Sequence, residues 1–139
     1  MKPTTLLELL SAVEQGTLTP DAAADRLKSL PFEDLGHTRV DHHRSLRSGL
    51  PEVIYAANKT PQQTLEIFTA LAATGVEVLA TRVDDLTATL VRDHHPQSHH
   101  NPIARTLSLT NPAAETQGHI AILCAGTSDI PIAEEAAVT

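Results

Sequence analysis

The sequence predicts an α/β fold, with an N-terminal helical hairpin, a small α/β domain and the beginning of a second domain built on a parallel sheet. After residue 36, short β-type runs alternate with helical patterns, which is typical of βαβ units and of a largely parallel sheet. Apolar residues make up 41% of the 139 residues, and this fraction excludes general disorder. Aromatic residues make up only 2%, so Ala, Leu, Ile and Val must build the core.

Charge and cysteine content limit the classes of function. Ten Lys and Arg against 17 Asp and Glu give a net charge of −7, which argues against a nucleic-acid partner because such proteins need a basic face. The single cysteine excludes an intrachain disulfide framework and fits a reducing compartment. No apolar run approaches the roughly 20 residues that span a bilayer. We therefore expect a cytoplasmic protein without a membrane partner.

Residues 1–35 predict a helical hairpin. Thr5 and Glu8 stand in the capping-box arrangement before a run of leucines at helical spacing, and Gly16 ends that helix. A second helix begins at Pro20 and runs to about Leu30. Two such helices cannot enclose a core of their own, so the hairpin is interpreted as an appendage.

Residues 36–110 predict the small α/β domain, followed by a polar linker at 111–118. The clearest helix begins after Thr60, which is its predicted N-cap. The predicted strands are His37–Val40, Val53–Ala56, Val76–Ala80 and Ala104–Leu109, and the predicted helices are Asp41–Arg47, Pro61–Thr74 and Asp84–Asp93.

Residues 119–139 predict one strand, a turn and a helix. Ile120–Cys124 is continuously apolar, as in strands buried on both faces of a parallel sheet. The helix from Ile130 to Thr139 has no C-terminal cap and no following strand. About 20 residues cannot form a domain, so the chain is expected to be the front part of a longer protein.

The first candidate site is the turn between that strand and that helix, which consists of Gly126, Thr127, Ser128 and Asp129. Helix N-termini at the carboxyl ends of strands bind anions, and a glycine there allows close backbone approach. Hydroxyl groups could donate to a phosphate, and the carboxylate could hold a ribose hydroxyl. The alternative is that Ser128 or Asp129 only caps the helix.

The second candidate site is a basic window inside an acidic chain. Residues 37–59 contain Arg39, Arg44, Arg47 and Lys59 against two acidic residues. Lys59 lies in a turn that ends a strand and opens a helix, another place that favours anions. The alternative is a solvated face with a helix cap.

Two further features are interpreted as non-functional. Pro96 interrupts the group His94, His95, His99 and His100 and prevents a regular helix there, and no cysteine lies near, so a mobile polar loop without metal is expected. Cys124 ends the apolar strand, and a buried, inert thiol is expected there.

Two stretches resemble a known family. Gly-Leu-Pro-Glu-Val-Ile-Tyr at 49–55, running on to Asn58-Lys59-Thr60, resembles the N-terminal signature of LarB, a family of nickel-pincer cofactor biosynthesis enzymes, whose members usually have Gly at the position of Asn58. Residues 125–136 look like the entrance to the LarB catalytic domain. That domain is similar to PurE, the aminoimidazole ribonucleotide carboxylase, whose nucleotide loop has a Gly-Ser-x-Ser-Asp pattern.

The resemblance implies a function for the whole protein. LarB carboxylates C5 of the pyridinium ring of nicotinate adenine dinucleotide, with CO₂ or bicarbonate as co-substrate, and hydrolyses its phosphoanhydride. No cofactor is implied to bind firmly, although Mg²⁺ is compatible, and the PurE-like domain implies a homo-octamer. The family's reactive cysteine is expected beyond Thr139, so the 139-residue chain alone is expected to be inactive.

The resemblance also assigns binding residues. Gly126, Thr127, Ser128 and Asp129 match the phosphate and ribose loop, whereas Arg44, Arg47 and Lys59 are weaker candidates for binding the dinucleotide. Two other readings stay open: a PurE-type carboxylase of purine biosynthesis, and a non-catalytic nucleotide-binding or assembly module.

Overall fold

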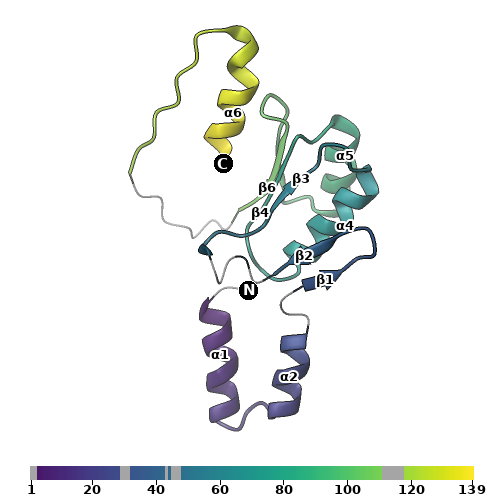
Figure 1. Ribbon diagram of the computed structural model, residues 1–139, viewed down its shortest axis with the longest axis vertical. Coiled ribbons are helices and arrows are strands. Elements are labelled where there is room, and N and C mark those ends of the chain that lie inside the picture. The colour runs from purple at the N-terminus through teal and green to yellow at the C-terminus, as the bar shows by residue number, and fades with distance from the viewer. Residues whose placement is uncertain (1–2, 29–31, 43, 45–47, 111–117) are drawn as a thin grey trace.

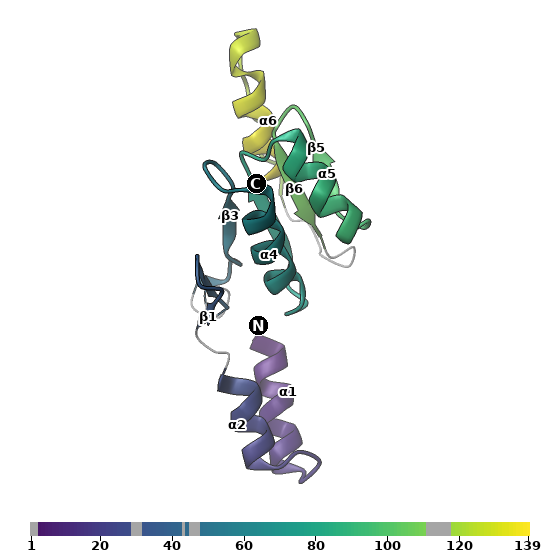
Figure 2. The ribbon, with the colours of Figure 1, turned by 90° about the vertical axis from the view of Figure 1, so that its right-hand side faces the viewer.

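The computed structural model describes residues 3–28, 32–42, 44, 48–110 and 118–139 (Figure 1). It is a mixed α/β structure with a helical pair, a two-stranded sheet and a four-stranded sheet, so the predicted α/β class is confirmed. In two perpendicular views the helical pair extends away from the sheets (Figures 1 and 2). No helix in the described ranges is long and apolar enough to cross a membrane.

The N-terminal helical hairpin is confirmed as α1 (Pro3–Glu14) and α2 (Pro20–Lys28). The predicted start of the first helix is wrong, because α1 begins at Pro3 and Thr5 lies within the helix and not at its N-cap. Gly16 adopts φ of 71° in the connecting turn, a conformation that glycine accepts without steric cost. Thr19 Oγ1 accepts a hydrogen bond from the backbone N–H of Ala22 at 3.2 Å and so caps α2. Residues 29 and 30 of the predicted second helix lie outside the described residues.

A β-hairpin precedes the main sheet, and the sequence predicted only its second strand. β1 (Phe32–Asp34) pairs antiparallel with β2 (Arg39–Asp41). Val40 of β2 is buried in the hydrophobic core, so the hairpin contributes to the same core as the main sheet. The predicted helix Asp41–Arg47 is wrong at Asp41, which belongs to β2, and most of its remaining residues lie outside the described ranges.

The main sheet is mixed, with the strand order β3-β4-β6-β5. Only the β3–β4 pair is parallel, and the other two pairs are antiparallel. The prediction of a largely parallel sheet was therefore wrong, because the short turn at 102–105 joins β5 to β6 and leaves no room for a crossover helix. The elements in chain order are β3 (Val53–Tyr55), α4 (Pro61–Ala72), β4 (Val78–Thr81), α5 (Asp85–His94), β5 (His99–Asn101) and β6 (Thr106–Leu109).

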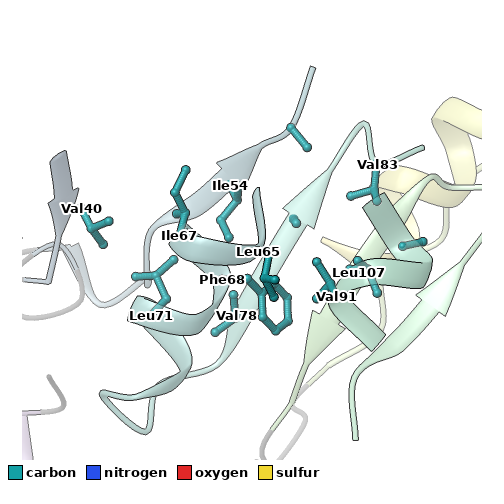
Figure 3. Close-up of a cluster of buried hydrophobic side chains, with 13 residues drawn as sticks. Val40, Ile54, Leu65, Ile67, Phe68, Leu71, Val78, Val83, Val91 and Leu107 are labelled. Carbon is teal, nitrogen blue, oxygen red and sulfur yellow. The ribbon is translucent and has the colours of Figure 1, made fainter. Parts of the chain in front are cut away.

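The hydrophobic core lies between one face of this sheet and helices α4 and α5 (Figure 3). Phe68 of α4 is fully buried, and Val78 and Leu107 face it from neighbouring strands. These strand residues alternate with residues that point to the other face of the sheet. The second face therefore carries Val53, Leu79 and Ser108, which are register partners across three strands.

The predicted strand at Ile120–Cys124 is wrong. This segment forms no strand, and Ile120 and Leu123 are 93% and 92% exposed. Cys124 is exposed as well, which corrects the expectation of a buried thiol. The physical reason is that no strand among the described residues pairs with the segment, so its apolar side chains have nothing to pack against.

The C-terminal half of helix α6 (Ile130–Val138) lies over the second face of the sheet, where the helix runs antiparallel to β3 and β4. Glu135 contacts Arg82, which directly follows β4. Val138 lines a cavity of about 210 Å³ together with Val53, at the amino end of β3. The N-terminus of α6 consequently projects beyond the carboxyl ends of the parallel strands, as Figure 1 shows.

Candidate functional site

The carboxyl ends of β3 and β4 meet the start of β6 at one end of the sheet. The Ala56 backbone N–H donates to the Thr81 carbonyl at 2.9 Å, and the Val83 N–H donates to the Arg105 carbonyl at 2.8 Å. These bonds place Lys59, Arg82 and Arg105 on three neighbouring loops. In open α/β sheets this end is where ligands bind.

Left-handed backbone conformation is concentrated at this end. Among the described residues, those other than glycine with positive φ are Asn58, Arg82 and Arg105, at 66°, 58° and 55°. Such a conformation costs on the order of 1–3 kcal/mol for a residue with a side chain and is frequent at functional sites. Asn58 suits its position because Asn is among the residues other than glycine that tolerate this conformation best.

Lys59 follows β3 and precedes α4. Its Nζ donates to the Tyr55 carbonyl at 3.0 Å, and its side chain is half-buried. Thr60 caps α4 as predicted: Thr60 Oγ1 accepts from the Gln63 N–H at 3.2 Å, and Gln63 Oε1 accepts from the Thr60 N–H at 2.9 Å. The cap reading of this turn is thus confirmed, and the Lys59 ammonium adds a positive charge beside it.

Arg105 holds the loop that follows β4. Its guanidinium lies 3.4 Å from the Val83 carbonyl and 3.5 Å from the Arg82 carbonyl. Hydrogen bonds from Thr87 hold the pKa of the neighbouring Asp84 carboxyl below its ordinary value, and the Arg105 charge acts in the same direction. The Asp84 carboxylate in turn caps α5 by accepting from the Thr87 N–H at 2.8 Å.

Arg82 was not singled out from the sequence. Its Nη2 lies 2.9 Å from Glu135 Oε2 of α6, with the Arg82 side chain 37% and the Glu135 side chain 18% exposed. The signal that could have found it is its position directly after the parallel strand β4, where ligand-binding residues of α/β sheets collect.

The predicted loop forms a short 3₁₀ turn, η1 (Thr127–Asp129), at the start of α6. Gly126 has an ordinary φ of −97°, and a Cβ there would meet Asp129 Oδ2 at 3.0 Å. Asp129 makes no side-chain capping bond to α6, so the structure gives no support to a purely capping role for this carboxylate. Ser128 Oγ lies 3.5 Å from Asp129 Oδ1, and all of these residues except the half-buried Gly126 are exposed.

The remaining predicted binding residues are not part of this cluster. Arg44 is exposed in the segment between β2 and β3, where its carbonyl accepts from Ser48 Oγ at 2.8 Å. This segment enters the sheet at the amino end of β3, opposite the end that carries Lys59. Arg47 lies outside the described residues.

The histidine cluster is not a simple loop, which corrects the sequence reading. His94 is the last residue of α5, and His99 and His100 belong to β5. The imidazole Nε2 of His100 is buried without a hydrogen-bond partner, and burial lowers the pKa of this ring. Within the described part of the chain, no group of three or more His, Cys, Asp or Glu side chains is placed to hold a metal ion.

Comparisons with known proteins identify the family of the chain. Residues 32–111 match the model of the LarB/PurE-like N-terminal domain. The chain is also 31% identical to the "Uncharacterized protein MJ0165" of Methanocaldococcus jannaschii over an alignment of 139 residues. The alignment covers 94% of this chain and 54% of that protein, so the chain spans about half the length of the curated relative it matches. The chain belongs to the family of LarB/PurE-like N-terminal domains.

Proposed function

We propose that this chain is part of a LarB-type enzyme that carboxylates and hydrolyses nicotinate adenine dinucleotide. We also propose that the chain contributes to binding the dinucleotide. The family match over residues 32–111 carries the proposal. It is supported by the position of Gly126, Thr127, Ser128 and Asp129 at the N-terminus of a helix that projects past the carboxyl end of the sheet. Because the chain spans about half of its relative, the full reaction is proposed for the whole protein.

The loop provides the groups that a phosphate and a ribose need. The Thr127 and Ser128 hydroxyls are exposed and can donate to phosphate oxygens, for which Ser128 exchanges its 3.5 Å contact with Asp129 Oδ1. The exposed Asp129 carboxylate can accept from a ribose hydroxyl. The dipole of α6 favours an anion at the same place. Lys59 supplies positive charge at the same end of the sheet, whereas Arg44 lies toward the other end and is a weaker candidate.

The chemistry of the proposed reaction sets further roles. The pyridinium ring is electron-poor and must be made nucleophilic before it can take up CO₂ or bicarbonate, which the LarB family achieves with a cysteine adduct. Cys124 lies three residues before η1 on an exposed segment, and we do not assign it this role. We propose assembly into a homo-oligomer and a cytoplasmic location.

The test is calorimetric titration of the 139-residue chain with nicotinate adenine dinucleotide. We expect saturable binding that a Thr127→Ala/Ser128→Ala double variant weakens about tenfold, because two neutral hydrogen bonds are lost. Thr89→Ala is the matched control, since Thr89 is an exposed hydroxyl on α5 far along the chain from the loop.

Aminoimidazole ribonucleotide serves as the competing ligand in a second titration. Tighter binding of aminoimidazole ribonucleotide than of the dinucleotide contradicts the proposal and favours a PurE-type function. Binding of the dinucleotide that is equal in the double variant and in Thr89→Ala contradicts the role of the loop.

A further inference from the structure

The second face of the sheet carries an aromatic ring beside an arginine. Tyr55 is 59% exposed and points to the same face as Val53, because strand residues alternate between faces. Its register partner is Thr81, and Arg82 is the next residue along the chain. The Lys59 ammonium contacts the Tyr55 carbonyl at 3.0 Å. Tyr55 and Arg82 thus lie at the ends of two paired strands, with the Lys59 ammonium at the same end of the sheet.

The backbone fixes the arginine in this place. Arg82 has a φ of 58°, and its carbonyl lies 3.5 Å from the Arg105 guanidinium. The neighbouring Val83 N–H donates to the Arg105 carbonyl at 2.8 Å. Arg105 therefore holds the backbone of this loop through two contacts, neither of which involves α6.

The guanidinium of Arg82 is already paired with a carboxylate. Arg82 Nη2 contacts Glu135 Oε2 at 2.9 Å, whereas a guanidinium offers five N–H donors in a planar fork that suits two oxygens of a carboxylate or phosphate. Beside it, Asn101 Nδ2 donates to Glu134 Oε2 at 3.2 Å. The helix that carries the Gly126 loop is thus attached to the sheet through two acidic side chains.

We propose that Arg82 and Tyr55 form a binding site for an anionic group carried on a planar ring, and that Glu135 fills this site when no ligand is bound. The ligand anion replaces the Glu135 carboxylate on Arg82, and the ring lies on Tyr55. Glu135 lies six positions after Asp129, which places the site about 9 Å along α6 from the loop. Resting on the proposed function, the ligand is the nicotinate end of the dinucleotide, with its phosphates at the loop.

The experiment uses the 139-residue chain and three small probes: nicotinate, nicotinamide, which lacks the carboxylate, and inorganic phosphate. Binding is followed by calorimetry and by amide chemical shifts. We expect Glu135→Gln to bind nicotinate about tenfold tighter, because the competing carboxylate is gone, and Arg82→Gln to lose binding. Glu134→Gln is the matched control and leaves the affinity unchanged.

The probes separate the anion from the ring. Tyr55→Ala is expected to weaken nicotinate and not phosphate, and nicotinamide is expected to bind at least tenfold more weakly than nicotinate. Equal binding of phosphate and nicotinate, with no effect of Tyr55→Ala, overturns the ring site.

A charge exchange tests the purely structural alternative. In the double variant Arg82→Glu/Glu135→Arg, the ion pair is re-formed but the arginine lies on α6. We therefore expect the free energy of unfolding to return to that of the unaltered chain, whereas nicotinate binding stays lost. Nicotinate affinity that stays the same in Glu135→Gln or in Arg82→Gln overturns the proposal. These small probes do not require the Gly126 loop. If the dinucleotide fails to bind at that loop, the nicotinate titrations therefore still test the Arg82 site.

Discussion

The ring of Phe68 packs against the imidazole of His95, with the ring centroids 5.3 Å apart and the planes inclined at 51°. The contact joins α4 to the C-cap residue directly after α5, and His95 Nε2 also lies 2.9 Å from Thr69 Oγ1. Phe68 has no exposed surface. We expect Phe68→Ala to reduce the free energy of unfolding by about 3–5 kcal/mol, measured by urea denaturation. Phe68→Leu is expected to cost clearly less, and equal losses would contradict a packing role for the ring.

Thr60 gives a second prediction, on the cap of α4. Thr60→Ala removes the oxygen that accepts from the Gln63 N–H, so the unfolding free energy should fall by about 0.5–2 kcal/mol. Thr60→Ser keeps that oxygen and serves as the control, with a loss well below that of the alanine variant. The same urea titration measures both variants.

Backbone strain at Arg82 predicts an unusual order of stability. Both Arg82→Gly and Arg82→Ala lose the ion pair with Glu135, but only glycine relieves the left-handed backbone. The glycine variant should therefore be more stable than the alanine variant by about 1 kcal/mol. At Arg92, within α5, the order should reverse by a similar amount. If the alanine variant is more stable than the glycine variant at both positions, the result contradicts backbone strain at Arg82.

His100 predicts a loss of stability in mild acid. Burial lowers the pKa of its imidazole below the ordinary 6.5, with Arg92 and His99 acting in the same direction and Asp85 against them. The unfolded chain therefore binds the proton first, and the stability due to this residue is present above pH 6.5 and declines as the pH falls through the lower folded value. His100→Leu should flatten the dependence of the unfolding free energy on pH below 6.5. His99→Gln is the control at the neighbouring residue. If the unfolding free energy of His100→Leu depends on pH as steeply as that of the unaltered chain, His100 is not the group responsible.

Cys124 predicts rapid thiol labelling in the native state. The side chain is exposed and is the single thiol of the chain. We expect a colorimetric disulfide reagent to react with it in buffer at nearly the rate seen in urea, with no change in the far-ultraviolet circular dichroism. Strong protection in buffer that urea removes would indicate a buried thiol and contradict the structure.

Local sequence signals predicted α2, α4 and α5 well. The helix expected at Pro61–Thr74 is α4 (Pro61–Ala72), because Thr60 and Gln63 supply a complete capping box within four residues. The turn around Gly16 is equally local. Signals of this kind depend on neighbouring residues alone and need no knowledge of the tertiary structure.

The strands that were missed depend on distant partners. β1 contains two acidic residues in three positions, and β5 is His-His-Asn, so neither has the composition of a strand. β5 exists because it pairs with β6 across a short turn. Arg82 was missed for a related reason, since its backbone conformation depends on contacts with Arg105, which lies 23 residues further along the chain.

The exposed segment Ile120–Cys124 gives this chain a tendency to associate with itself. Ile-Ala-Ile-Leu-Cys has no charge and no proline, and two of its aliphatic side chains are almost fully exposed. No backbone hydrogen bond joins it to the described part of the chain, so its N–H and carbonyl groups form a template on which the same segment of a second molecule can add as a strand. Turbidity of the isolated chain should accordingly rise steeply with protein concentration, and a lysine in place of Ile122 should suppress it.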